Sequence, residues 1–193
     1  IVVNRPSENV QSGQAAVANS GSINAEGGRV ILTSNSLNGV IRNSVNNSGI
    51  ITANSLVERN GEIFLTSGGD NSSVVNTGTV DASASEAGAN GGFIEFSAEH
   101  LDLARGTMDA SSVSGKPGTI LLDPDFFTID DAWADIFADH NGSNIVVEAD
   151  LDVNFQLSGG LLDFTNFDTE TFIVHAGRDI NQNGNTIVTH GGN

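Results

Sequence analysis

The side chains in this sequence that could do chemistry are mainly carboxylates, and four of them gather in one short stretch. Asp123, Asp125, Asp130 and Asp131 follow an apolar run that ends at Leu122. Ca²⁺ prefers several oxygen ligands, so these four aspartates are the candidate Ca²⁺ ligands of the chain. The sequence contains neither an Asp-x-Asp-x-Asn-Gly loop nor a Gly-Gly-x-Gly-x-Asp repeat, which are common settings for bound Ca²⁺.

Other chemistry finds little support in the sequence. Hydrolysis of a glycosidic bond needs a pair of carboxylates in a groove, and a lyase needs a base, often Arg or Lys, near acidic ligands. None of the seven Arg and Lys residues lies beside a clear carboxylate cluster. The four histidines are far apart in the sequence, there is no cysteine, and no phosphate-binding or nucleophile motif is present. We therefore predict no catalytic residue, no enzymatic activity and no cofactor beyond the Ca²⁺ candidate.

The charge of the chain limits its partners. The formal net charge is −17 at pH 7. Residues 1–97 hold 8 acids and 4 bases, a net charge of −4, whereas residues 98–193 hold 16 acids and 3 bases, a net charge of −13. Nucleic acid and anionic membrane both require basic surface, so we exclude them as partners. No apolar run approaches the roughly 20 residues of a membrane-spanning helix, and we predict no membrane insertion.

A repeat positions these side chains. The pattern Asn-x-Gly-x-apolar-x-Ala occurs at residues 19–25, 47–53 and 76–82, with a weaker copy at 104–110. The closing alanines are 28, 29 and 28 residues apart, a period typical of a solenoid. We expect Asn19, Asn47 and Asn76 to form a ladder of amides at one corner. A row of amides that binds glycans is the alternative interpretation.

Two further elements accompany each copy of this repeat. A strand with alternating apolar residues begins near positions 30, 63, 94, 120, 145 and 172, and its intervening residues, such as Glu95, point outward. A shorter apolar element precedes each Asn-x-Gly. Three short strands per period of about 28 residues predict a three-faced parallel β-helix of about 25–30 residues per coil. Ile23, Ile51, Val80 and Met108 should then stack in one interior column.

The variable segments lie between the two repeats. Residues 54–59, 83–90 and 111–116 follow the closing alanines and should leave the coil at the same corner. Insertions stacked on one edge of a solenoid commonly form a binding surface, although they are also tolerated as slack. We predict a partner-binding edge formed by eight residues of these insertions: Leu56, Glu58, Arg59, Ser85, Glu86, Asn90, Ser114 and Lys116.

The regular pattern changes after Leu122. Residues 1–122 read as regular coils, residues 123–143 as a turn, a strand and a short acidic helix, and residues 144–193 as continuing coils. Asp130 is a suitable N-cap for a helix near 130–138, whose apolar face we expect to pack on the outside of the coils with Trp133 as its anchor. The three segments form one continuous domain. Its start lacks a solenoid cap, so we expect an excerpt from a longer chain.

These motifs resemble a known family. Asn-x-Gly-x-Ile-x-Ala followed by Gly-Gly-x-Val-x-Leu resembles the repeats of filamentous-haemagglutinin-type adhesins, the large exoproteins of bacterial two-partner secretion. Residues 118–125 resemble the Gly-Thr-x-Leu-x-Asp-Pro element of such proteins, and residues 144–149 and 176–181 are similar to two later elements. The resemblance covers residues 15–193. The amino-terminal secretion domain, with its Asn-Pro-Asn-Gly type motif, is not visible.

The resemblance implies a right-handed parallel β-helix that is exported through an outer-membrane transporter to the surface or surroundings of a Gram-negative-type bacterium. We therefore expect a structural or adhesive stalk segment whose partner is a host or bacterial surface glycan or protein, including biofilm matrix. A carbohydrate-active β-helix enzyme, either a polysaccharide lyase or a hydrolase, is the alternative. A segment of a haem-acquisition exoprotein and a passive spacer are further alternatives.

Overall fold

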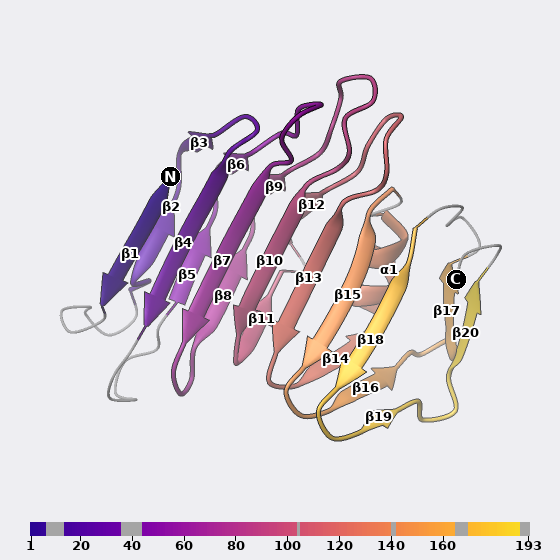
Figure 1. Cartoon of the computed structure of the whole chain (residues 1–193). Coiled ribbons are helices and arrows are strands. Elements are labelled where there is room, and N and C mark those ends of the chain that lie inside the picture. Colours follow the sequence, from indigo (N-terminus) through magenta and orange to yellow (C-terminus); the bar gives the residue numbers. More distant parts are fainter. Residues whose placement is uncertain (7–13, 36–43, 104, 140–141, 165–169, 190–193) are drawn as a thin grey trace.

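In a computed structural model the chain forms a parallel β-solenoid of about six turns (Figure 1). The structure describes residues 1–6, 14–35, 44–103, 105–139, 142–164 and 170–189. Within these residues the named strands pair in parallel, and each strand pairs with its equivalent in the next coil. The predicted parallel β-helix is confirmed.

Three sheets form the sides of the first four coils. The long sheet, which extends through all the coils, contains β1 (Val2–Pro6), β4 (Arg29–Asn35), β7 (Glu62–Gly68), β10 (Phe93–Ala98), β13 (Thr119–Pro124), β15 (Asn144–Ala149) and β18 (Phe172–Ala176). The second sheet contains β2 (Val17–Asn19), β5 (Ser44–Asn47), β8 (Ser73–Asn76) and β11 (His100–Asp102). The third sheet contains β3 (Ser22–Asn24), β6 (Ile50–Thr52), β9 (Thr79–Asp81) and β12 (Thr107–Asp109).

The interior of the solenoid consists of stacked columns of apolar side chains. In the long sheet one column contains the predicted positions Val30, Ile63, Ile94, Ile120, Ile145 and Phe172. In the third sheet Ile23, Ile51, Val80 and Met108 pair in register, as predicted. Strands alternate inward and outward, so this register buries one apolar set from coil to coil.

The asparagine ladder is a structural element of one corner. Asn19 Nδ2 donates to Asn47 Oδ1 over 2.8 Å, and Asn47 Nδ2 donates to Asn76 Oδ1 over 2.8 Å. Asn47 and Asn76 are fully buried. Their amides therefore satisfy one another inside the protein, which is the predicted corner ladder and not an exposed row of glycan-binding groups.

Glycine is required beside this ladder. A β-carbon on Gly49 would lie 2.1 Å from the carbonyl oxygen of Gly21, and one on Gly78 would lie 2.0 Å from that of Gly49. The backbones of successive coils thus approach too closely at this corner for any side chain. This contact explains why the glycine of the Asn-x-Gly pattern repeats.

The last coils replace two of the three sheets. One side is formed by β14 (Phe127–Asp130), β16 (Val153–Gln156) and β19 (Ile180–Asn181), and another by β17 (Leu161–Phe164) and β20 (Thr186–Thr189). Helix α1 (Asp131–Asp139) follows β14 and contacts both β14 and β17. It therefore takes the place in its coil that β17 takes in the next coil.

The expected packing of α1 on the outside of the coils is wrong. Trp133 and Phe137 are buried members of the main core. The ring centroid of Trp133 lies 4.7 Å from that of Phe127, and Phe137 lies 5.2 Å from Phe172. The large aromatic rings fill the space that a helix leaves when it replaces a strand, so the helix is part of the coil wall.

Candidate functional site

Two clusters of polar side chains lie at opposite ends of the same strands of the long sheet. The three insertions, residues 54–59, 83–90 and 111–116, directly precede β7, β10 and β13, and we call them the insertion edge. The second cluster lies where these strands end, and we call it the acidic groove. It is lined by Ser67, Gly68, Gly69, Asp70, Ser72, Ser97, Ala98, Glu99, Asp123, Asp125 and Asp150.

The three insertions stack on one another at one corner, as predicted. Backbone hydrogen bonds join Ser55 N to Ser83 O over 2.8 Å and Ala84 N to Ser111 O over 2.9 Å. Val113 N returns a bond to Ala84 O over 3.1 Å. The insertions thus continue the coil-to-coil hydrogen bonding beyond the strands, and Figure 1 shows them side by side above β6, β9 and β12.

Several of the predicted partner-binding residues hold the insertions together. Asn90 Oδ1 accepts a hydrogen bond from Lys116 N over 2.9 Å, and Ser114 Oγ accepts one from Gly88 N over 3.0 Å. Glu86 Oε2 accepts from Val57 N over 3.4 Å. These side chains position the edge, and their bonded atoms have less capacity for a partner.

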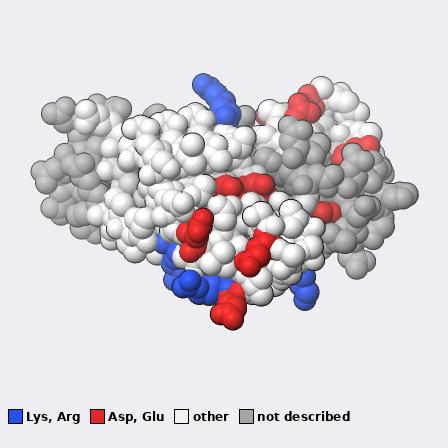
Figure 2. Space-filling model, turned by 90° about the horizontal axis from the view of Figure 1, so that it is seen from above, with Lys and Arg blue, Asp and Glu red and all other residues white. Residues whose placement is uncertain are grey.

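The other predicted residues of the edge differ in exposure. Leu56 is partly buried and lies against Gly27, where an added β-carbon would be 3.0 Å from Leu56 Cδ1. Glu58, Arg59, Ser85 and Lys116 are exposed. Seen from the side of this edge, charged side chains are dispersed over a largely uncharged surface (Figure 2).

Two apolar residues of the insertion edge were not among the predicted residues. Val57 is 54% exposed and Val113 is 71% exposed. Protein interfaces commonly have an apolar centre and a polar rim, so these two valines are candidate contact residues. Their sequence signal is an apolar residue in a mainly polar insertion: Val57 follows Leu56 in the first insertion, and Val113 stands alone in the third.

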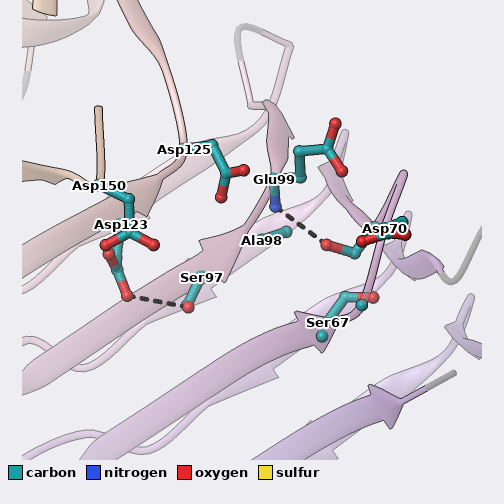
Figure 3. A pocket seen from close by; sticks show the side chains of 11 residues that line it. Ser67, Asp70, Ser97, Ala98, Glu99, Asp123, Asp125 and Asp150 are labelled. Carbon is teal, nitrogen blue, oxygen red and sulfur yellow. Dashed lines mark hydrogen bonds between the residues drawn. The ribbon is translucent and has the colours of Figure 1, made fainter. Parts of the chain in front are cut away.

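The acidic groove gathers carboxylates from four successive coils in a space of about 310 Å³ (Figure 3). Asp70, Glu99, Asp125 and Asp150 follow the ends of β7, β10, β13 and β15, and Asp123 lies within the end of β13. Only Asp123 and Asp125 were predicted. The other three have a sequence signal, because each occurs just after a copy of the same apolar strand.

Hydrogen bonds fix part of the groove. Ser97 Oγ donates to Asp123 Oδ2 over 3.0 Å, and Glu99 N donates to Ser72 Oγ over 3.0 Å (Figure 3). Glu99 also accepts a hydrogen bond from Asn71 N and lies 3.2 Å from His100 Nε2. The groove is therefore a built surface of hydroxyl groups and carboxylates.

Burial and like charge raise pKa values here. Burial is the main cause of the raised pKa of Asp123, the carboxylates of Asp150, Glu148 and Asp125 raise it further, and the Ser97 hydrogen bond opposes them. Burial also raises the pKa of Asp125, together with Glu99 and Asp150. Carboxylates with raised pKa values accept and release protons nearer to neutral pH, which suits proton transfer or the binding of a cationic group.

The four candidate Ca²⁺ ligands do not form one site. Asp123 and Asp125 line the groove. Asp130 instead caps α1, because its Oδ1 accepts from Trp133 N over 3.1 Å, and Asp131 Oδ1 accepts from Ser158 N over 2.9 Å. Among the described residues, no group of three or more His, Cys, Asp or Glu side chains could hold a metal ion.

No family model, no curated protein and no solved structure matched this chain. In the part of the chain that the structure describes, no helix has both the length and the apolar character needed to cross a membrane.

Proposed function

We propose that this chain is a stiff stalk segment of a bacterial surface or secreted protein, and that its insertion edge binds a partner. The observation that carries this proposal is the unbroken register of the long sheet, in which seven strands stack from β1 to β18. Each coil contacts its neighbours through backbone hydrogen bonds and buried columns, an arrangement that favours a rigid rod with a laterally exposed surface.

The insertion edge suits attachment better than catalysis. Its three loops are fixed to one another by backbone bonds, and they present Val57 and Val113 beside exposed polar groups. A surface that is ordered before binding loses little conformational entropy when a partner arrives. A host or bacterial surface glycan or protein is the proposed partner, and export through an outer-membrane transporter belongs to the same proposal.

A binding assay with matched variants tests the proposal. Purified chain is applied to bacterial or host cells and to a glycan array, and the double variant Val57→Ser/Val113→Ser is compared with Ile50→Ser. Ile50 is a similarly exposed apolar residue, 48% exposed, on the third sheet. We expect the double variant to lose most of the binding and the control to retain it. Equal binding by both variants would show that Val57 and Val113 do not contact the partner and would refute the insertion edge. No binding by the unaltered chain would leave a passive spacer.

Carbohydrate hydrolysis is the second candidate, and the acidic groove is the observation that favours it. A glycoside hydrolase uses one carboxyl group as a proton donor and a second as a base or nucleophile, and raised pKa values suit the donor. Release of reducing ends from neutral and acidic polysaccharides, with and without Ca²⁺, tests this activity. If the unaltered chain releases reducing ends and Asp123→Asn/Asp125→Asn does not, the chain is an enzyme and the stalk proposal is wrong.

Haem acquisition gains no support from the described histidines. His100 lies beside Glu99 and His175 lies 3.4 Å from Glu148 Oε1, and both side chains are exposed. His140 and His190 lie outside the described residues.

A further inference from the structure

The outer face of the long sheet carries a row of apolar side chains that the core does not use. We call five of these residues, which occupy equivalent outward positions on β4, β7, β13, β15 and β18, the outer row: Ile31, Phe64, Leu121, Val146 and Ile173. All five are partly or largely exposed, and none belongs to the core cluster or packs against it. Figure 1 shows this face toward the viewer, and no labelled helix or strand lies in front of β4, β7, β10 and β13.

Aromatic rings concentrate near the middle of this face. Phe93 lies beside the outer row, and its ring centroid is 5.6 Å from that of Phe64. The guanidinium carbon of Arg29 lies 5.4 Å from the centroid of the Phe64 ring. An aromatic face attracts cations through its quadrupole, and the contact between Arg29 and Phe64 is an interaction of this kind.

Glu95 interrupts the outer row between Phe64 and Leu121. Within the described residues it has no hydrogen-bond or ion-pair partner. Burial raises the pKa of Glu95, and the nearby carboxylates of Asp123 and Glu148 raise it further. A cation bound here would offset both the partial desolvation of the carboxylate and the repulsion from its neighbours.

The outer row is continuous with the acidic groove. Ser97 follows Glu95 at the next outward position of β10, and its in-register neighbour on β13 is Asp123. Ser97 and Asp123 both line the groove. From Phe93 to Glu99 the strand direction covers about 20 Å, which is enough for several sugar rings in a row. Along β10 the outward surface therefore changes from aromatic rings at Phe93 to carboxylates at the groove.

These features restrict the ligand. The central strands are paired on both sides, so no backbone edge is open to an added peptide strand. The excess of carboxylates disfavours anionic glycans through like-charge repulsion. The ligand that fits best is a linear polymer. Its rings have an apolar face that contacts the phenylalanines, its hydroxyl groups donate hydrogen bonds, and its positive charges lie near the carboxylates.

We propose that the outer face of the long sheet, from Phe64 and Phe93 through Glu95 to Asp123, binds a linear amino-sugar polymer with free ammonium groups. The rings of the polymer stack on the phenylalanines. Its ammonium groups contact Glu95 and Asp123, and its hydroxyl groups donate to the oxygens of the groove. This surface is separate from the insertion edge, and the proposal goes beyond the stalk function.

Calorimetric titration at mildly acidic pH tests the proposal. The purified chain is titrated with a short glucosamine oligomer, with the matching N-acetylglucosamine oligomer, and with a lysine-rich peptide of the same charge. We expect the glucosamine oligomer to bind at least about tenfold more tightly than the acetylated one, as one close charge pair can supply. Equal affinity for the two oligomers, or no binding of either, would overturn the proposal.

Variants separate ring stacking from simple charge attraction. Glu95→Gln and Phe93→Ala should each weaken binding of the glucosamine oligomer about tenfold, whereas Asp135→Asn, which removes an exposed charge on α1, should leave it unchanged. Thermal unfolding confirms that each variant is folded. A lysine peptide that binds as tightly as the sugar, with no effect of Phe93→Ala, would show that charge alone is recognised and the proposal is wrong.

The same titration distinguishes binding at the sheet face from binding at the insertion edge. Oligomer binding that is lost in Val57→Ser/Val113→Ser and retained in Glu95→Gln would refute this site while supporting the edge. The reverse pattern would support the sheet face alone.

Discussion

The asparagine ladder and the acidic groove stack similar side chains from coil to coil, with opposite physical results. In the ladder, the amides of Asn19, Asn47 and Asn76 donate and accept along one line. In the groove, Asp70, Glu99, Asp125 and Asp150 meet at the ends of successive strands. An amide is both donor and acceptor, whereas a carboxylate only accepts, so repetition connects the amides and makes the carboxylates repel.

The difference bears on function. A buried, self-satisfied ladder stabilises the rod and offers nothing to a ligand. A row of like charges costs stability, and carboxylates with perturbed pKa values are frequent at functional sites. Four predictions, in order of decreasing effect, concern the tight contacts between coils and the repulsion among the carboxylates of the groove.

Asn47→Asp should break the ladder at its centre. The substitution removes the donor to Asn76 Oδ1 and places a buried carboxylate against that acceptor, so we expect a loss of about 3–5 kcal/mol in the free energy of unfolding. Urea unfolding measures it. Asn181→Asp, in the exposed pair with Asn154, is the matched control and should change the free energy by less than about 0.5 kcal/mol. Similar losses in both variants would contradict the role of burial.

Gly61→Ala should disturb the junction between the first insertion and β7. An added β-carbon would lie 1.3 Å from Ala53 O, so the backbone must shift, and we expect a loss of about 3 kcal/mol by the same measurement. Gly21→Ala has no atom within 4 Å of its added β-carbon and should cost less than about 1 kcal/mol. An unaffected Gly61→Ala would mean that the insertion is not tightly joined to the coil.

Asp125→Asn should stabilise the protein by removing one of the repelling charges of the groove. We expect a gain of up to about 1 kcal/mol in low salt that decreases as salt screens the charges. Asp131→Asn is the control, because Asp131 has a lowered pKa from its hydrogen bond with Ser158 and should instead lose a little stability. A destabilised Asp125→Asn would show that the groove contains a favourable interaction of this carboxylate.

The pH dependence of the free energy of unfolding should also reflect the repulsion among the groove carboxylates, and we expect this effect to be the smallest of the four. The raised pKa values of Glu95, Asp123 and Asp125 mean that the folded state binds protons more readily than the unfolded state. Their unfavourable contribution is fully present above the raised pKa values and is relieved as pH falls through them. The lowered pKa values of Asp131 and Asp152 act oppositely, since their contribution is lost below the ordinary aspartate range.

Asp123→Asn/Asp125→Asn isolates the contribution of the groove. Thermal unfolding across the mildly acidic range should show that the stability difference between this variant and the unaltered chain decreases as pH falls. A difference that is constant with pH would contradict the raised pKa values.

Much of the fold was predictable because its causes are local and repeated. Alternating apolar residues specify the faces of a strand, and their recurrence predicted the columns that begin at Val30 and Ile23. The same reasoning placed the three insertions at one corner and Asp130 at the start of the helix. It was wrong about α1, because a lone amphipathic helix gives no sign of whether it covers a wall or replaces one.

The groove was only partly predictable. Asp123, Asp125, Asp130 and Asp131 were grouped because they are close in sequence, yet the chain separates them between a strand end and a helix start. The sequence did not indicate Asp70, Glu99 and Asp150, because they are distant from Asp123 along the chain and come close to it only through the stacking of the coils.

The sequence by itself determined the period, the three strands of a coil, the inward side chains and the positions of the insertions. Only the tertiary structure decided which side chains of different coils meet. The spacing between paired residues of the long sheet changes from 33 at Arg29 and Glu62 to 26 at Ser97 and Asp123. Turn lengths absorb these changes, and the backbone hydrogen bonds between coils restore the register, so neighbours across coils are set by stacking and not by a fixed spacing in the chain.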